Sequence, residues 1–265
     1  GGVRSLHSRS LIGPEDLADN ERIKYGDLAK VGWAPRMRSA FGYFTPDDHY
    51  EAVVSKLVTP GCAWLDVGCG RDIFPSNREL ARILSSRCAL LVGVDPDPTL
   101  DENRWVHQRV RSTIDEFRSD QKFDVITLRM VAEHIADPAR AVAALARLTK
   151  PGGKVAIYTV NRWSPVTIAS SAIPFWLHNP IKRYLWGTEE EDTFPVSYQM
   201  NTRLELARLF GATDFREHCF TYLDDCRTFC RFRATLLLEL LSWRVIRAFR
   251  MKYPENCLLG VYERL

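Results

Sequence analysis

Short apolar runs alternate with amphipathic stretches through the middle of the chain. Runs of strand length occupy 62–68, 89–95, 104–110, 123–130 and 154–160. Between them, residues 76–87 and 138–150 repeat apolar side chains at helical spacing, and the second stretch stops at Pro151-Gly152-Gly153. Strands that alternate with helices predict a parallel, doubly wound sheet, which binds ligands at the carboxyl ends of its strands.

The two ends of the chain follow other patterns. Residues 1–20 are polar and predict a frayed start, whereas 21–58 combine aromatic side chains with helical periodicity, including a helix near 46–58. After 161, an insertion rich in aromatics and prolines precedes a helix at 201–212 and two last strands at 215–223 and 257–265. One long or two short helices fill the gap of about 30 residues between those strands.

These patterns predict an α/β fold with a Rossmann-like, seven-stranded sheet in a single structural domain. Its parts are an N-terminal helical cap, a cofactor-binding core, an aromatic insertion that forms a lid over the substrate, and a C-terminal part of the sheet with an inserted basic helix. These parts span 1–58, 59–161, 162–200 and 201–265. Insertions at the carboxyl edge of such a sheet favour an enclosed substrate pocket.

Composition narrows the classes of function. The 265 residues include 46% apolar side chains, enough for a full core, and the net charge of +3 gives no indication of nucleic acid binding. Seven cysteines without a CxxC pair favour buried free thiols in a reducing cytosol. The chain shows no secretory h-region at its start and no apolar run of membrane-spanning length. We therefore expect a cytoplasmic protein.

The candidate chemistry begins where the first predicted strand ends, in Asp66-Val67-Gly68-Cys69-Gly70. Glycine lets the backbone turn tightly and approach a ligand closely. A carboxylate such as Asp66 is out of place facing a pyrophosphate, but it suits a ligand that carries a positive charge. Asp95 ends the second predicted strand, where a carboxylate accepts hydrogen bonds from a ribose diol.

Four segments in this order and spacing resemble the class I S-adenosylmethionine-dependent methyltransferases: LDVGCG, GVDPD, FDVITLRMVAEHIADP and LTKPGGKVAIYT. The resemblance covers about 63–160, and Glu133-His134 is similar to the branch that contains quinone-biosynthesis and sugar O-methyltransferases. It implies that S-adenosylmethionine is the cofactor and that S-adenosylhomocysteine is the product. It also implies a set of cofactor-binding residues: Asp66, Gly68, Cys69, Gly70, Asp95, Pro96, Arg111, Arg129 and Met130.

His134 is the candidate general base, because a neutral imidazole can accept the proton of a hydroxyl acceptor. The alternative is that His134 only caps a helix or shields the cofactor. Glu133 either orients His134 or is an acid favoured by the dipole at a helix start. Residues 130–132 contain no acid that could add a metal ligand, so we expect no metal. Arg71 either reaches the cofactor carboxylate or pairs with an acid of the cap.

Side chains of the cap and of the insertion are candidate substrate contacts: Arg38, Tyr43, His49, Trp163 and Trp176. The region 227–252 is basic and amphipathic, which predicts either peripheral contact with the inner face of a membrane or an ordinary packed helix with arginines at its surface. Neither the Asn/Asp-Pro-Pro-aromatic motif of adenine methyltransferases nor a Pro-Cys motif follows 123–130. We therefore expect no nucleic acid partner.

The sequence favours O-methylation of a small molecule or a glycan, with a lipid-linked acceptor as one form of it. The alternatives are N- or C-methylation of a natural product by proximity alone, and a non-catalytic protein that retains the fold. A nicotinamide oxidoreductase would need a third glycine and a Tyr-x-x-x-Lys pair, and the chain has neither. The oligomeric state stays open.

Overall fold

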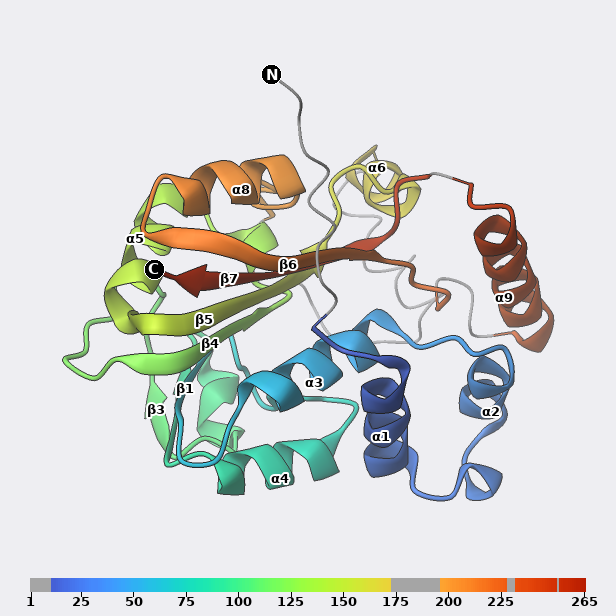
Figure 1. Ribbon diagram of the computed structural model, residues 1–265, viewed down its shortest axis with the longest axis horizontal. Helices are drawn as coiled ribbons and strands as arrows, with labels where there is room; N and C mark the ends of the chain where they lie inside the picture. Colours follow the sequence, from blue (N-terminus) through green and yellow to red (C-terminus); the bar gives the residue numbers. More distant parts are fainter. Residues whose placement is uncertain (1–10, 173–195, 228–231, 252) are drawn as a thin grey trace.

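The computed structural model describes residues 11–172, 196–227, 232–251 and 253–265, apart from the side chains of 169–172. Its centre is one seven-stranded sheet in the order β3-β2-β1-β4-β5-β7-β6 (Figure 1). Neighbours pair in parallel, except that β7 is antiparallel to both β5 and β6. The strands are β1 Ala63–Val67, β2 Leu90–Val94, β3 Gln108–Val110, β4 Phe123–Arg129, β5 Thr149–Val160, β6 Phe215–Leu223 and β7 Cys257–Arg264. The predicted doubly wound sheet is confirmed.

Helices cover both faces of the sheet and its carboxyl edge. They are α1 Pro14–Tyr25, α2 Trp33–Ala40, α3 Pro46–Leu57, α4 Arg78–Arg87, α5 Pro138–Leu148, α6 Pro165–Ala172, α8 Arg203–Gly211 and α9 Arg233–Ala248. Three short 3-10 turns join them: η1 Leu28–Lys30, η2 Pro98–Glu102 and η3 Ala132–His134. The helix predicted near 46–58 is α3, which starts at a capping box of Thr45 and Asp48.

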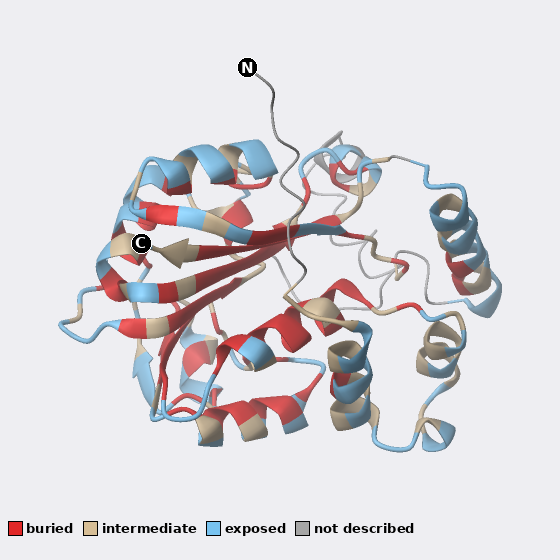
Figure 2. Ribbon diagram, in the orientation of Figure 1, coloured by how far each residue is buried: buried red, intermediate tan, exposed pale blue. Residues whose placement is uncertain are grey.

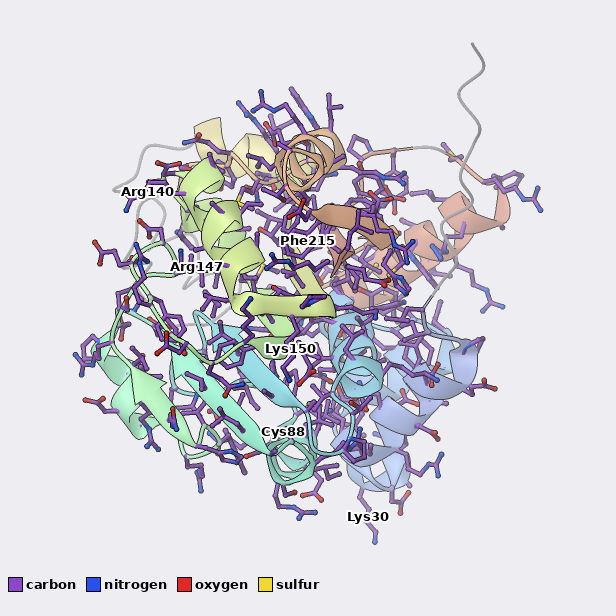
Figure 3. All side chains as sticks on the ribbon, turned by 60° about the vertical axis from the view of Figure 1, so that its left-hand side comes forward. Lys30, Cys88, Arg140, Arg147, Lys150 and Phe215 are labelled. Atoms are coloured by element: carbon purple, nitrogen blue, oxygen red, sulfur yellow. The ribbon has the colours of Figure 1, made fainter. Side chains whose placement is uncertain are left out.

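Two apolar layers hold the helices to the sheet, and the strands between the two edge strands β3 and β6 are largely buried (Figure 2). On one face, Tyr50 of α3 and Leu80 of α4 pack with Trp64 of β1. On the other face, α5 and α8 pack through Leu145 and Phe210. The polar side of α5 faces solvent, as the exposed Arg140 and Arg147 labelled in Figure 3 illustrate. Helix periodicity alone places the apolar side of each of these helices toward the sheet.

Two sequence-based predictions of element bounds were wrong. The chain does not fray to residue 20, because α1 begins at Pro14 and its Asn20 is buried against Glu51 of α3. The predicted helix 138–150 ends at Leu148, and β5 starts at Thr149, which pairs with Phe123. The Pro-Gly-Gly segment therefore lies within an extended strand beside a shift in register. Tertiary pairing with β4 overrides the local stop signal.

The carboxyl edge of the sheet is where the parts far apart in sequence meet. Because β7 is antiparallel to both neighbours, β6 ends at the same edge as β1, β2, β4 and β5. Helices α2 and α9 lie beyond this edge, at the right of Figure 1. A separate apolar cluster joins the two helices through Tyr43, Leu236 and Leu240. The fold thus brings the start of the chain and the β6–β7 insertion to the ligand-binding edge.

Candidate active site

The loop after β1 is shaped by two glycines with positive φ, +68° at Gly68 and +44° at Gly70. The amide of Gly70 donates a hydrogen bond to Oδ2 of Asp95 at 2.8 Å, and the amide of Asp97 donates to its Oδ1 at 2.8 Å. Asp95 is buried at the end of β2 and retains acceptor capacity on both oxygens. The predicted glycine loop and the predicted acid therefore meet at one place.

Asp66 lies buried beneath this loop, in a chain of hydrogen bonds. Nε1 of Trp64 donates to Oγ1 of Thr127 at 2.7 Å, and Thr127 in turn donates to Oδ1 of Asp66 at 2.6 Å. Burial raises the pKa of Asp66 to about 7, while the Thr127 bond and the charge of Arg129 partly oppose the rise. A positively charged ligand group would stabilise the ionised form of this buried carboxyl.

Gly68 also controls the loop that follows β4. A Cβ at Gly68 would lie 2.1 Å from Cγ2 of Val131, so a side chain there displaces that loop. Met130, which precedes Val131, has φ +52°, which is uncommon for a residue with a side chain. The amide of Met130 donates a hydrogen bond to the carbonyl of Tyr158 at 2.8 Å. The glycine loop and the loop carrying the candidate base are therefore built against each other.

Glu133 and His134 form the turn η3 immediately after Val131. Oγ1 of Thr159, at the end of β5, donates to Oε2 of Glu133 at 2.5 Å. Burial raises the pKa of the Glu133 carboxyl, and the Thr159 bond and the charge of His134 partly oppose this rise. The carbonyl of Glu133 accepts from the amides of Ser197 and Tyr198. Glu133 is thus a buried anchor of η3, and the half-buried His134 follows it.

An ionic network that sequence reasoning missed lies at the same edge. Asp47, at the start of α3, binds Nη2 of Arg129 at 2.9 Å and Nη1 of Arg227 at 2.6 Å, and Arg227 also binds Asp225. Despite burial, the two guanidinium groups hold the pKa of Asp47 well below its usual value. No local sequence pattern predicts this network, because its partners lie 82 and 180 positions from Asp47.

Several predicted cofactor contacts are arranged differently from the expectation. Arg111 pairs with Asp101 at 2.6 Å, and Arg71 pairs with Glu102 at 2.7 Å, so both arginines bind the η2 turn. Arg71 therefore pairs with an acid of η2 and not with an acid of the cap, which was one of the two roles predicted for it. The thiol of Cys69 packs against Gly93, where an added Cβ would lie 2.7 Å from Sγ. Pro96 follows Asp95 and is exposed.

The predicted substrate contacts are scattered. Tyr43 is buried, and its hydroxyl donates to the carbonyl of Asp224 and accepts from the amide of Cys226, which makes it a structural tie. Arg38 is half-buried on α2, and its carbonyl accepts from the Tyr43 amide. His49 lines an apolar cavity of about 330 Å³ between α3 and β6. Trp163 is exposed after β5, and Trp176 lies outside the described residues.

The site residues fit a cofactor with an adenosine and a cationic amino acid. Because Gly70 has no side chain, a ligand can approach Asp95 closely. The buried Asp66 carboxylate would be stabilised by a positively charged group of the ligand. The side chain of Tyr50, in α3, is buried close to Asp66. Burial and the charge of Asp66 raise the pKa of Tyr50 well above its usual value. Fold and site together define the class of proteins that bind such a cofactor at the carboxyl edge of a doubly wound sheet.

Comparison with known proteins identifies the family. A family model for a methyltransferase domain matches residues 42–219. The ubiquinone biosynthesis O-methyltransferase of Xanthomonas euvesicatoria is 32% identical over 176 residues, covering 63% of this chain and 72% of that protein. That of Saccharophagus degradans is 34% identical over 164 residues, covering 56% and 66%. The chain belongs to the S-adenosylmethionine-dependent methyltransferases.

The match to the first relatives is partial. The ubiquinone biosynthesis O-methyltransferase of Coxiella burnetii is 28% identical over 160 residues, so the match spans just under two thirds of that protein. Among solved structures, an S-adenosylmethionine-dependent methyltransferase from Mesorhizobium loti has a TM-score of 0.54 at 17% identity, covering 83% of this chain and 98% of that one. Geranyl diphosphate C-methyltransferase from Streptomyces coelicolor has a TM-score of 0.53 at 18% identity, covering 87% and 77%. These structures establish the fold.

Within the described ranges, no cluster of three or more His, Cys, Asp and Glu side chains gathers as a metal site would. No helix there is long and apolar enough to cross a membrane. Six free cysteines are buried, which agrees with the predicted free thiols: Cys62, Cys69, Cys88, Cys219, Cys226 and Cys257.

Proposed function

We propose that this methyltransferase methylates a hydroxyl group of a small molecule or a glycan, with His134 as general base. The observation that carries the proposal is the position of η3. The close approach of Gly68 to Val131 ties this turn to the cofactor loop, and the Thr159–Glu133 hydrogen bond anchors it to β5. A base held on such a turn lies beside the carboxyl edge, where an acceptor can reach it.

The cofactor supplies an electrophilic methyl group on its sulfonium, and transfer to oxygen is an in-line displacement. Asp66 would pair with the ammonium group of the cofactor, the backbone of Gly68 to Gly70 would approach its amino acid end closely, and Asp95 would accept hydrogen bonds from the ribose hydroxyls. Arg129 and Met130 form the wall beside the reacting centre. His134 would take the acceptor proton onto a ring nitrogen while the acceptor oxygen bonds to the methyl carbon, the carbon–sulfur bond breaks and S-adenosylhomocysteine leaves.

The relatives and one exposed aromatic side chain support this acceptor class. The three relatives described above are all named for O-methylation in ubiquinone biosynthesis. Trp163 is exposed just beyond β5, where it can pack on an apolar acceptor. We place the enzyme in the cytoplasm, with peripheral contact to the inner face of the membrane through the basic region 227–252.

The test is methyl transfer from isotopically labelled S-adenosylmethionine to matched hydroxyl and amine acceptors. We expect labelling of the hydroxyl series, and His134→Ala should lower turnover by about 10²- to 10⁴-fold. Calorimetry should find S-adenosylhomocysteine affinity unchanged in the variant, because His134 acts on the acceptor. Preferential labelling of amines, or full turnover by the variant, contradicts the proposal.

A further inference from the structure

The segment that joins β2 to β3 binds the glycine loop after β1 at several points. Asp95, the first residue of this segment, accepts a hydrogen bond from the Gly70 amide at 2.8 Å. Ten positions further on, Nε1 of Trp105 donates to Oδ1 of Asp72 at 2.8 Å. The loop is therefore held by side chains that the β2–β3 segment supplies, and not by its own contacts alone.

Asn103 is the residue of this segment that reaches the centre of the loop. It follows η2, and its exposed fraction is 0%. Its Nδ2 donates hydrogen bonds to the carbonyl oxygens of Gly70 at 3.0 Å and of Cys69 at 3.4 Å. A primary amide carries two N–H donors, so one side chain can serve both carbonyls. The amide oxygen is also used, because it accepts from the Trp105 amide at 3.0 Å.

The backbone of Asn103 is fixed independently of the loop. Its amide donates to the carbonyl of Leu100 at 3.0 Å, which closes the η2 turn. Its carbonyl accepts from Nε of Arg109 at 2.9 Å and also from Nη2 of the same side chain. Arg109 lies on β3, so the sheet itself determines where Asn103 stands. The side chain is thus ordered before any ligand arrives, and ligand binding bears no cost for ordering it.

The consequence for Gly70 is that both polar groups of its backbone are bound. Asp95 accepts from its amide, and Asn103 donates to its carbonyl. Gly70 has φ +44°, and glycine has more conformational freedom to lose than any other residue. Without the Asn103 bonds, this loop would sample other conformations, and a ligand would have to order it on binding.

We propose that Asn103 is a positioning residue of the cofactor site, which holds the glycine loop in the conformation that receives S-adenosylmethionine. It acts through the carbonyls of Cys69 and Gly70, because its whole side chain is enclosed by the protein. This rests on the proposed function only in assigning the cofactor to this loop. Asn103 also sets the loop against Asp95, so the amino acid side and the ribose side of the site are fixed relative to each other.

Calorimetry of S-adenosylhomocysteine with Asn103→Ala and Asn103→Asp, each well below its melting temperature, tests this role. Alanine removes both donors, whereas aspartate has nearly the same size and keeps an acceptor for Trp105 but has no N–H group. We expect the affinity to fall about tenfold in Asn103→Ala and at least as much in Asn103→Asp. With the acceptor that the labelling assay identifies, KM for S-adenosylmethionine should rise by a similar factor while kcat stays within about twofold.

The matched control is Asn20→Ala. Asn20 is also a buried amide, and its Nδ2 donates to Oε2 of Glu51 at 2.9 Å in the contact of α1 with α3. This variant should have a lower melting temperature and unchanged affinity for S-adenosylhomocysteine.

Two results overturn the proposed role of Asn103. They are wild-type affinity in both Asn103 variants, and an equal loss of affinity in Asn20→Ala, which would make Asn103 a residue of general stability. The affinity measurement needs no acceptor. If the wild-type chain binds S-adenosylhomocysteine and the Asn103 variants bind it more weakly, but no hydroxyl is methylated, the proposed function fails and the role of Asn103 stands.

Discussion

At the scale of single residues, the loop after β1 has two functions. The sequence assigns Gly68 to a tight turn near a ligand, and its φ of +68° agrees with this. The contact with Val131 is a second constraint, because it sets the loop on which Glu133 and His134 stand. One missing side chain therefore shapes both the glycine loop after β1 and the turn that carries the candidate base.

Gly68→Ala tests this double constraint. The added methyl group must displace Val131 and also adopt a positive φ, so we expect a lower melting temperature and a loss of turnover of about 100-fold or more. Gly61→Ala is the matched control, since Gly61 has φ +76° with no atom near its missing Cβ. If both variants lose stability and turnover equally, the backbone strain alone is responsible and the Val131 contact has no role.

Asp66 makes cofactor binding depend on pH. Its pKa of about 7 means that the free protein holds a proton there below neutral pH. The ammonium group of the cofactor binds the carboxylate form of Asp66, so binding must release this proton. The affinity for the cofactor therefore falls as the pH drops below about 7. Calorimetry of S-adenosylhomocysteine from pH 5.5 to about 8 should show affinity rising and then levelling off. Asp66→Asn should bind more weakly with a flat profile, and a flat wild-type profile would contradict the assignment.

At the scale of elements, the Asp47 network fastens three segments at the mouth of the site. It joins the start of α3, the end of β4 and the linker from β6 to α9. Arg129 and Arg227 are 28% and 31% exposed at their side chains, so the network is partly buried and its charges are only partly screened. Removal of one charge from this network should therefore destabilise the folded state.

Asp47→Asn should lower the free energy of unfolding by up to about 3 kcal/mol, the low end for a broken buried ion pair, because water still reaches the arginines. The pKa of Asp47 is depressed, so its stabilisation is present above about pH 4 and is lost as the pH falls below that value. Urea unfolding from pH 7 down to about 3 should therefore show a flatter acid limb in the variant. Asp19→Asn, at an exposed pair with Arg22, should change little.

At the scale of the whole molecule, cofactor binding stabilises a site assembled from four strand ends. S-adenosylhomocysteine at 100 times its Kd should add about 2.7 kcal/mol of stability, which raises Tm by roughly 5–10 °C for a chain of this size. NAD at the same concentration should leave Tm unchanged. The Asp95→Asn variant should show a smaller shift with S-adenosylhomocysteine. A rise in Tm with NAD but not with S-adenosylhomocysteine would contradict this prediction and favour an oxidoreductase.

The sequence by itself determined the sheet and the position of the glycine loop after β1. Apolar runs, helical periodicity and glycine positions are local signals. Asp66, Asp95 and the turn at Gly68 could be predicted as neighbours because the carboxyl ends of parallel strands meet at one edge of a doubly wound sheet. The end of α5 was misread for a related reason. Pro-Gly-Gly is a local stop signal, but the pairing of Thr149 with Phe123 extends β5 beyond it.

Only the tertiary structure decided which side chains face one another. Asp47, Arg129 and Arg227 meet across gaps of 82 and 180 positions, and Tyr43 became a tie to Asp224 rather than a substrate contact. The direction of α9 was decided in the same way. Its sequence has apolar residues on more than one side, and packing on α2 buries Leu236 and Leu240 and leaves Leu238 exposed to solvent. Ion pairs and helix orientation depend on long-range packing, which leaves no local pattern in the chain.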